Sequence, residues 1–470
     1  MSAIAIRISL LFALVVAFGL SARPKRVTLE WQQVNQAEES GQVGTAAVSL
    51  MRIQAAQPWR SDLSYLTAQY ALNAGNWSLG LESLGRINPN RLTAADWTAM
   101  GDAYWELDQP EQAVQAWERS RAVTENADAI SRLYTFHRKQ QDLSSILADL
   151  QALHRLQPGD AALAYQLAVQ LTVSSPQEAL IFINKTRIED EIIQSKLKNL
   201  SASLQAAVQR LSAAEQLLVA GQGLAELGEW ELAGRAFQQS LELEPAYAEA
   251  LAYLGEARQH LEPADMEAAL ADLRQALRLN PKSIAANSML ALYWQRRGDF
   301  SRAANLYRSA AALEPENPAW FAALGGLASV QGNLPSAEGY YHYAASLAEQ
   351  EAVYWRMLAV FYLTNQIRIA DQAFIAANQA VKLDPDDPAN LDVLAQVYLQ
   401  QDKPEEARRL LDEALQKDPR FAPAYLHLSM IFLLQGRAEL AYFYLQQARL
   451  YALDQPTVNQ VDRLMLYYFP

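Results

Sequence analysis

Residues 284–317 read IAANSMLALYWQRRGDFSRAANLYRSAAALEPEN, and this stretch sets the pattern for most of the chain. Large apolar residues recur every three or four positions, which predicts two amphipathic helices. Gly298 stands where the first helix would end in a left-handed turn. Pro315 follows the second helix, which it cannot continue because proline lacks a backbone N–H. The stretch therefore predicts one helix–turn–helix unit, with the small Ala291 where its two helices approach closely.

The same residue types recur at equivalent positions along the chain, with a nearly constant spacing. The segments 214–247, 318–351, 388–421 and 422–455 repeat the apolar stripe, the small residue and the turn. Two further units, 248–283 and 352–387, need two extra residues near the turn between their helices. Weaker copies fill residues 27–193, so the sequence predicts about twelve units in all.

These residues resemble the tetratricopeptide repeat family. The unit length, the small residue in the eighth place and a run such as Ala303, Tyr307, Ala310 and Pro315 match the family pattern. The resemblance is strong over 214–455 and weaker upstream. It implies an all-α, right-handed α-solenoid of helix pairs in which the first helix of each pair lines a concave groove.

The repeats divide the chain into five expected regions. Residues 27–193 form an N-terminal degenerate array, 189–213 a long connecting helix, 214–455 a C-terminal array and 456–470 a capping helix. The connecting helix is expected because Glu189 to Arg210 contains neither proline nor glycine. It is either a spacer between two grooves or a repeat whose second helix has grown.

The fifth region, residues 1–26, is a hydrophobic segment with a basic flank. Residues 8–22 carry no charge, and 22 residues at about 1.5 Å each would cross a bilayer core of about 30 Å. Arg23, Lys25 and Arg26 follow, and basic residues tend to stay on the cytoplasmic side. We therefore expect residues 1–22 to anchor the protein in a bacterial-type cell membrane, with its body in the cytoplasm. The alternative is a cleaved signal peptide followed by export.

Composition and motifs narrow the function. The chain holds 39 Lys and Arg and 52 Asp and Glu, and four of the bases but no acid lie in the first 26 residues, so the remainder carries a charge of −17. Such a body repels phosphate backbones, which argues against nucleic-acid partners. There is no cysteine, the five histidines form no metal-spaced pair, and no phosphate-binding loop motif is present. We expect no catalytic residue, no cofactor and no metal.

The resemblance implies that partner-contacting side chains come mainly from the second, fifth, sixth, ninth, twelfth and thirteenth places of each unit. A carboxylate clamp is not expected, because the fifth and ninth places are occupied by pairs such as Ala322 and Gly326, or Arg356 and Val360. The groove is expected to be apolar with amide edges, and its two arginines could anchor an acidic group of a partner. The predicted groove residues are Tyr253, Met289, Gln295, Arg296, Arg356, Met357, Val360, Gln396, Gln400, Met430 and Leu433.

These expectations favour a non-catalytic scaffold or adaptor, tethered to the membrane, that binds a peptide segment or helix of another protein in its groove. The alternative is an exported or envelope-associated assembly factor for a polysaccharide, lipid or secretion pathway. The sequence predicts no oligomeric state.

Overall fold

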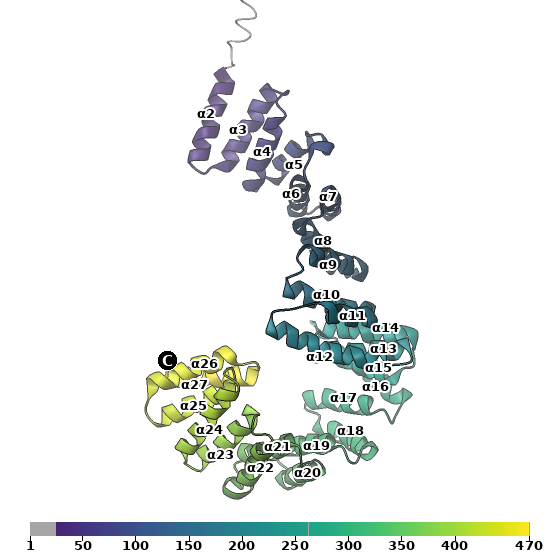
Figure 1. Ribbon diagram of the computed structural model, residues 1–470, viewed down its shortest axis with the longest axis vertical. Coiled ribbons are helices and arrows are strands. Elements are labelled where there is room, and N and C mark those ends of the chain that lie inside the picture. Colours follow the sequence, from purple (N-terminus) through teal and green to yellow (C-terminus); the bar gives the residue numbers. More distant parts are fainter. Residues whose placement is uncertain (1–24, 262, 470) are drawn as a thin grey trace, which may run out of the picture. The chain divides into compact units, whose positions relative to one another are not determined.

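The computed structural model describes residues 25–261 and 263–469. These residues form 26 α-helices, one 3-10 helix and one π-helix, and no strand occurs among them (Figure 1). The chain divides into two compact units, the first ending at Val208 and the second beginning at Gln209. The predicted all-α repeat architecture is therefore confirmed for the described part of the chain.

The first unit is a succession of antiparallel helices, each packed on the next in sequence. Its elements are α2 (Lys25–Glu39), α3 (Val43–Ala56), α4 (Asp62–Asn73), α5 (Trp77–Gly85), η1 (Pro89–Arg91), α6 (Ala94–Glu106), α7 (Pro110–Val123), α8 (Ala127–Gln140), α9 (Leu143–Leu156), α10 (Ala161–Ser174), α11 (Pro176–Lys185) and α12 (Glu191–Val208).

The second unit contains seven helix pairs and a final single helix. Its elements are α13 (Ala213–Glu226), α14 (Trp230–Leu243), α15 (Ala248–Gln259), α16 (Met266–Leu279), α17 (Ile284–Arg296), α18 (Phe300–Leu313), α19 (Pro318–Val330), α20 (Leu334–Leu347), α21 (Ala352–Thr364), η2 (Ile369–Ala373), α22 (Phe374–Leu383), α23 (Pro388–Gln400), α24 (Pro404–Lys417), α25 (Ala422–Leu434), α26 (Ala438–Tyr451) and α27 (Gln455–Tyr468).

The turns inside the pairs are made where the sequence predicts them. Gly228, Gly298, Gly332 and Gly436 all have φ between +69° and +80°, the left-handed conformation that glycine adopts without steric cost. Asp402 takes the same place in its own pair, with φ of 58°. Each turn reverses the chain within three residues, so the two helices of a pair pack side by side.

The two units with extra residues depart from this turn as expected. Between α15 and α16 the turn lengthens to six residues. After α21 the chain passes through Gln366 and Arg368, both with positive φ, and then through the π-helix η2. A π-turn takes up additional residues within a helix without shifting the apolar face that follows it.

The described residues form two α-helices more than the 24 of twelve helix pairs. The additional helices are α12, which packs on α10 and α11, and α27, which packs on α26 and buries Val461. Helix α12 begins and ends two residues inside the Glu189–Arg210 stretch that the sequence marks as helical. The predicted membrane segment, residues 1–22, lies outside the described residues. Within the described ranges, no helix combines the length and the apolar character needed to cross a bilayer.

Candidate functional site

A cleft of about 630 Å³ opens within the second unit along the first helices α17, α19 and α21. Helix α19 forms its floor, because Ala319, Ala322, Ala323 and Gly326 leave little side-chain volume there. A Cβ added at Gly326 would meet only the Tyr341 hydroxyl, at 3.5 Å, so the space above this glycine is open. The cleft exists because small residues line one helix between two helices with larger side chains.

The cleft is lined mainly by apolar side chains, and several of them are accessible. Met357 and Val360 on α21 are each 41% exposed, and Val330 at the end of α19 is 67% exposed. Helix α19 carries no ionisable residue. Accessible apolar side chains gathered around one concave site are typical of a binding site.

One polar pair borders the cleft. The Tyr307 hydroxyl donates a hydrogen bond to Gln295 Oε1 at 3.1 Å. Burial raises the pKa of Tyr307 to about 12, so the ring stays neutral and remains a donor at physiological pH. The amide edge expected from the sequence is therefore present at Gln295, whose side-chain oxygen already accepts the hydrogen bond from Tyr307.

Four of the eleven predicted groove residues line this cleft: Gln295, Arg356, Met357 and Val360. The remaining seven lie elsewhere on first helices of the second unit. They are Tyr253 on α15, Met289 and Arg296 on α17, Gln396 and Gln400 on α23, and Met430 and Leu433 on α25. Tyr253 packs its ring on Phe237, with 5.4 Å between the ring centroids, and Leu433 packs against the core.

The floor of the cleft was not among the predicted residues. Ala319, Ala322, Ala323 and Gly326 occupy the second, fifth, sixth and ninth places of the unit 318–351, the places that the family resemblance marks. Their places in the repeat therefore indicate the groove, although small side chains give no chemical indication of a site. Their contribution is the volume they leave free.

The two groove arginines are paired within the chain. Arg296 donates to both carboxylate oxygens of the buried Glu256, at 2.7 and 3.0 Å, and to Gln259 at 3.0 Å. Arg356 forms an ion pair with Asp387 and donates to the buried Asn390 at 2.7 Å. Burial by itself would raise the pKa of Glu256, but the hydrogen bonds from Arg296 and His260 outweigh it and lower that pKa. Neither arginine is a free cation, so anchoring an acidic group of a partner would require these pairs to open.

A fourth polar pair joins α23 and α25. His427 Nδ1 lies 2.5 Å from Asp392 Oδ1, and Gln396 donates to the other carboxylate oxygen at 2.9 Å. Asp392 is only 4% exposed. Burial lowers the pKa of His427, but the charge of Asp392 and its hydrogen bond outweigh burial, so the pKa is raised above the ordinary 6.5.

The raised pKa of His427 gives the second unit a pH dependence. The folded state binds the histidine proton more tightly than the unfolded state, so this contribution to stability is complete below about pH 6.5 and is lost as the pH rises through the folded pKa. We expect the melting temperature of the wild-type protein to fall relative to that of His427→Gln as the pH increases above 6.5. Thermal unfolding followed by circular dichroism across this range measures the difference. Parallel curves for the two proteins would contradict the assignment.

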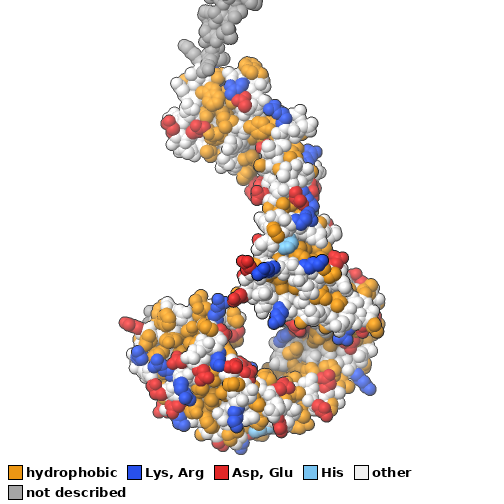
Figure 2. Space-filling view, in the orientation of Figure 1, with side chains coloured by type: hydrophobic (Ala, Val, Ile, Leu, Met, Phe, Trp, Pro, Cys, Tyr) orange, Lys and Arg blue, Asp and Glu red, His pale blue; other side chains and the backbone are white. Residues whose placement is uncertain are grey.

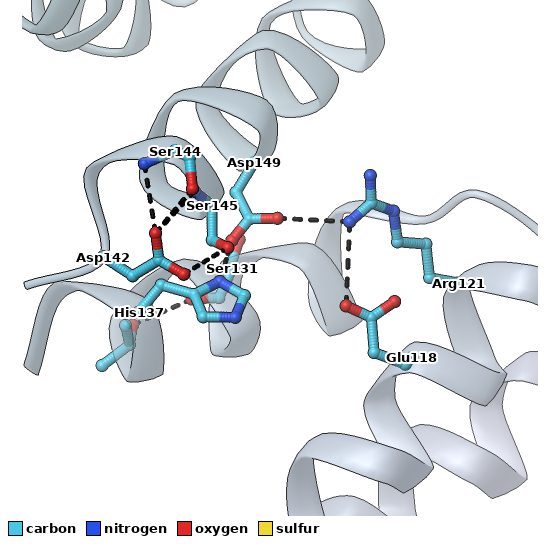
Figure 3. Close-up of polar contacts among 9 residues, drawn as sticks. Glu118, Arg121, Ser131, His137, Asp142, Ser144, Ser145 and Asp149 are labelled. Carbon is cyan, nitrogen blue, oxygen red and sulfur yellow. Dashed lines mark hydrogen bonds and ion pairs between the residues drawn. The ribbon is translucent and has the colours of Figure 1, made fainter. Parts of the chain in front are cut away.

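The first unit holds another buried histidine–carboxylate pair (Figure 3). Asp149 on α9 is 1% exposed, lies 2.7 Å from His137 Nδ1 on α8 and accepts a hydrogen bond from Arg121 on α7 at 3.3 Å. Burial raises the pKa of Asp149 in spite of these two partners. The nearby Ser144 and Ser145 hydroxyls donate to Asp142, which caps the start of α9. These contacts join three consecutive helices, and we assign the pair a structural role.

Potential metal ligands are scattered. Across residues 25–261 and 263–469, no group of three or more His, Asp or Glu side chains is placed to hold a metal ion.

Comparison with known families identifies the repeats. Residues 288–352 and 398–461 each match a family model described as tetratricopeptide repeat. The predicted tetratricopeptide repeats are thereby confirmed, and proteins built from them generally mediate protein–protein interactions. No curated protein matches the chain.

Several solved structures resemble the fold. The yeast protein Tom70 is 15% identical, with a TM-score of 0.37, and the match covers 80% of this chain and 95% of that one. A tetratricopeptide repeat protein from Parabacteroides merdae is 18% identical, with a TM-score of 0.44, over 54% of this chain and 98% of that one. PilF from Pseudomonas aeruginosa is 21% identical, with a TM-score of 0.36, over 47% of this chain and 97% of that one.

Proposed function

We propose that the protein is a non-catalytic scaffold whose second unit holds a segment of a partner protein along α17, α19 and α21. The observation that carries this proposal is the cleft of about 630 Å³, with its floor of small residues and its accessible Met357 and Val360. A partner helix or extended segment would place a large apolar side chain above Gly326. Burying such a side chain contributes about 1.5–3 kcal/mol, enough to select one segment over another.

The proposal includes a membrane tether. It rests on the sequence of residues 1–22, whose uncharged run and basic flank are typical of an N-terminal anchor with the body on the cytoplasmic side. A tether of this kind raises the effective concentration of the scaffold near membrane-bound partners. A reporter fused to the C-terminus that is active only outside the cytoplasm would contradict this orientation.

Filling the cleft should weaken segment binding. We expect Gly326→Leu to weaken the binding of selected peptides at least tenfold, because the new side chain occupies the space of the partner's apolar anchor. Peptides are first selected on the full chain from a random library displayed on phage. Their dissociation constants are then measured by fluorescence anisotropy, and the selected sequences are expected to share one large apolar residue.

The matched control is Gly339→Leu. Gly339 is an exposed glycine in α20 with no neighbouring atom within 4 Å of an added Cβ, so the same substitution there leaves the cleft open. Equal affinity of the selected peptides for wild type and Gly326→Leu, with both variants folded, would place the binding site elsewhere.

A further inference from the structure

A second cleft lies in the first unit, outside the groove of the second unit. Its volume is about 860 Å³, and it is lined by the end of α11, the connecting residues 186–189 and one face of α12. Lys and Arg side chains, with Asp and Glu side chains among them, lie exposed in the region of α10 to α12 (Figure 2). No part of this cleft contributes to the partner site proposed above.

The cleft has a positive lining in an acidic protein. Lys185, Arg187 and Lys198 line it, together with a single carboxylate, Glu189. All three cations are exposed, and none forms an ion pair with a described residue. By contrast, the groove arginines of the second unit are neutralised by carboxylates of the chain. Three cations against one carboxylate leave the lining with a net positive charge, which favours an anionic ligand.

The connecting segment offers unpaired backbone groups beside these charges. Arg187, Ile188 and Glu189 lie between the two helices, and within the described chain their N–H and C=O groups make no backbone hydrogen bond. A short segment outside the helices, with free donors and acceptors, can pair with the backbone of another chain. Leu197, buried on α12, and the half-buried Ile188 give the cleft an apolar part.

We propose that this cleft binds an acidic peptide segment in an extended conformation. The three cations would pair with its carboxylates, the connecting residues would bond to its backbone, and Ile188 and Leu197 would contact its apolar side chains. The volume is far larger than a single phosphate group requires. Free backbone groups suit a peptide better than a membrane surface, which offers no matching chain of amides.

The test uses the full chain and a short blocked peptide of alternating glutamate and alanine carrying a rhodamine label of zero net charge. Fluorescence anisotropy at low ionic strength is expected to show saturable binding, which weakens as salt is added because the cations are exposed. The triple variant K185Q/R187Q/K198Q should weaken binding about tenfold. The same peptide with glutamine in place of glutamate should not bind.

Two controls make the result decisive. The variant R274Q/K282Q/K382Q removes the same charge from exposed positions of the second unit and should change the affinity less than twofold. Inorganic phosphate and phosphatidylserine vesicles are tested on the same proteins. Equal losses in the two triple variants, no peptide binding, or cleft-dependent binding of phosphate or vesicles in preference to the peptide would each overturn the proposal. Gly326→Leu should leave this binding unchanged, which separates it from the partner site of the second unit.

Discussion

Replacing Gly255 with leucine is expected to lower the free energy of unfolding of the second unit by about 3 kcal/mol. Gly255 stands in the small-residue place of α15, against α16. A Cβ there would lie 2.8 Å from Leu273 Cγ and 2.9 Å from the backbone oxygen of Ala269. The Leu273 side chain can move aside, but the backbone of α16 cannot move unless α15 and α16 separate. The larger side chain therefore forces the two helices apart and disrupts the packing of the neighbouring pairs.

Thermal and urea unfolding followed by circular dichroism measure this effect, and limited proteolysis locates it near α15 and α16. Gly339→Leu serves as the control, because its added side chain meets open space and leucine favours a helix over glycine by about 0.5–1 kcal/mol. The two substitutions are thus expected to shift stability in opposite directions. If Gly255→Leu were as stable as Gly339→Leu, the close approach of α15 and α16 would not limit residue size.

The repeat architecture could be predicted because each repeated position meets one local structural requirement. Glycine at 228, 298, 332 and 436 meets the need for positive φ at the turn, and Gly255 or Ala291 meets the need for close approach. These requirements concern residues within one helix pair, so they can be recognised in a single sequence. The two extra residues near the turns of units 248–283 and 352–387 were also visible, because an insertion shifts every later column.

The groove could be predicted only in part, because it depends on contacts between pairs. Arg296 and Glu256 are 40 residues apart, and Arg356 and Asp387 are 31 apart, so no local pattern indicates that these charges neutralise each other. The cleft itself forms because Gly326 and its small neighbours leave the space above α19 unfilled. Large residues at the groove places predict the walls at Met357 and Val360, whereas the small residues of the floor have no side chain that would mark them as a site.

Replacing His427 with leucine is expected to cost the second unit about 3 kcal/mol at neutral pH. The substitution leaves the Asp392 carboxylate buried between α23 and α25, with Gln396 as its remaining side-chain donor. A buried charge that loses its partner keeps the cost of its removal from water but not the compensating attraction. The loss therefore exceeds what one hydrogen bond contributes.

The double variant Asp392→Leu/His427→Leu distinguishes this cause from simple loss of packing. Removing both partners eliminates the unpaired charge, so the double variant is expected to be more stable than His427→Leu alone. Urea unfolding of the wild type, both single variants and the double variant gives the coupling free energy of the pair. If the stability lost by the double variant equals the sum of the losses of the two single variants, Asp392 and His427 stabilise the second unit independently, each through its own packing.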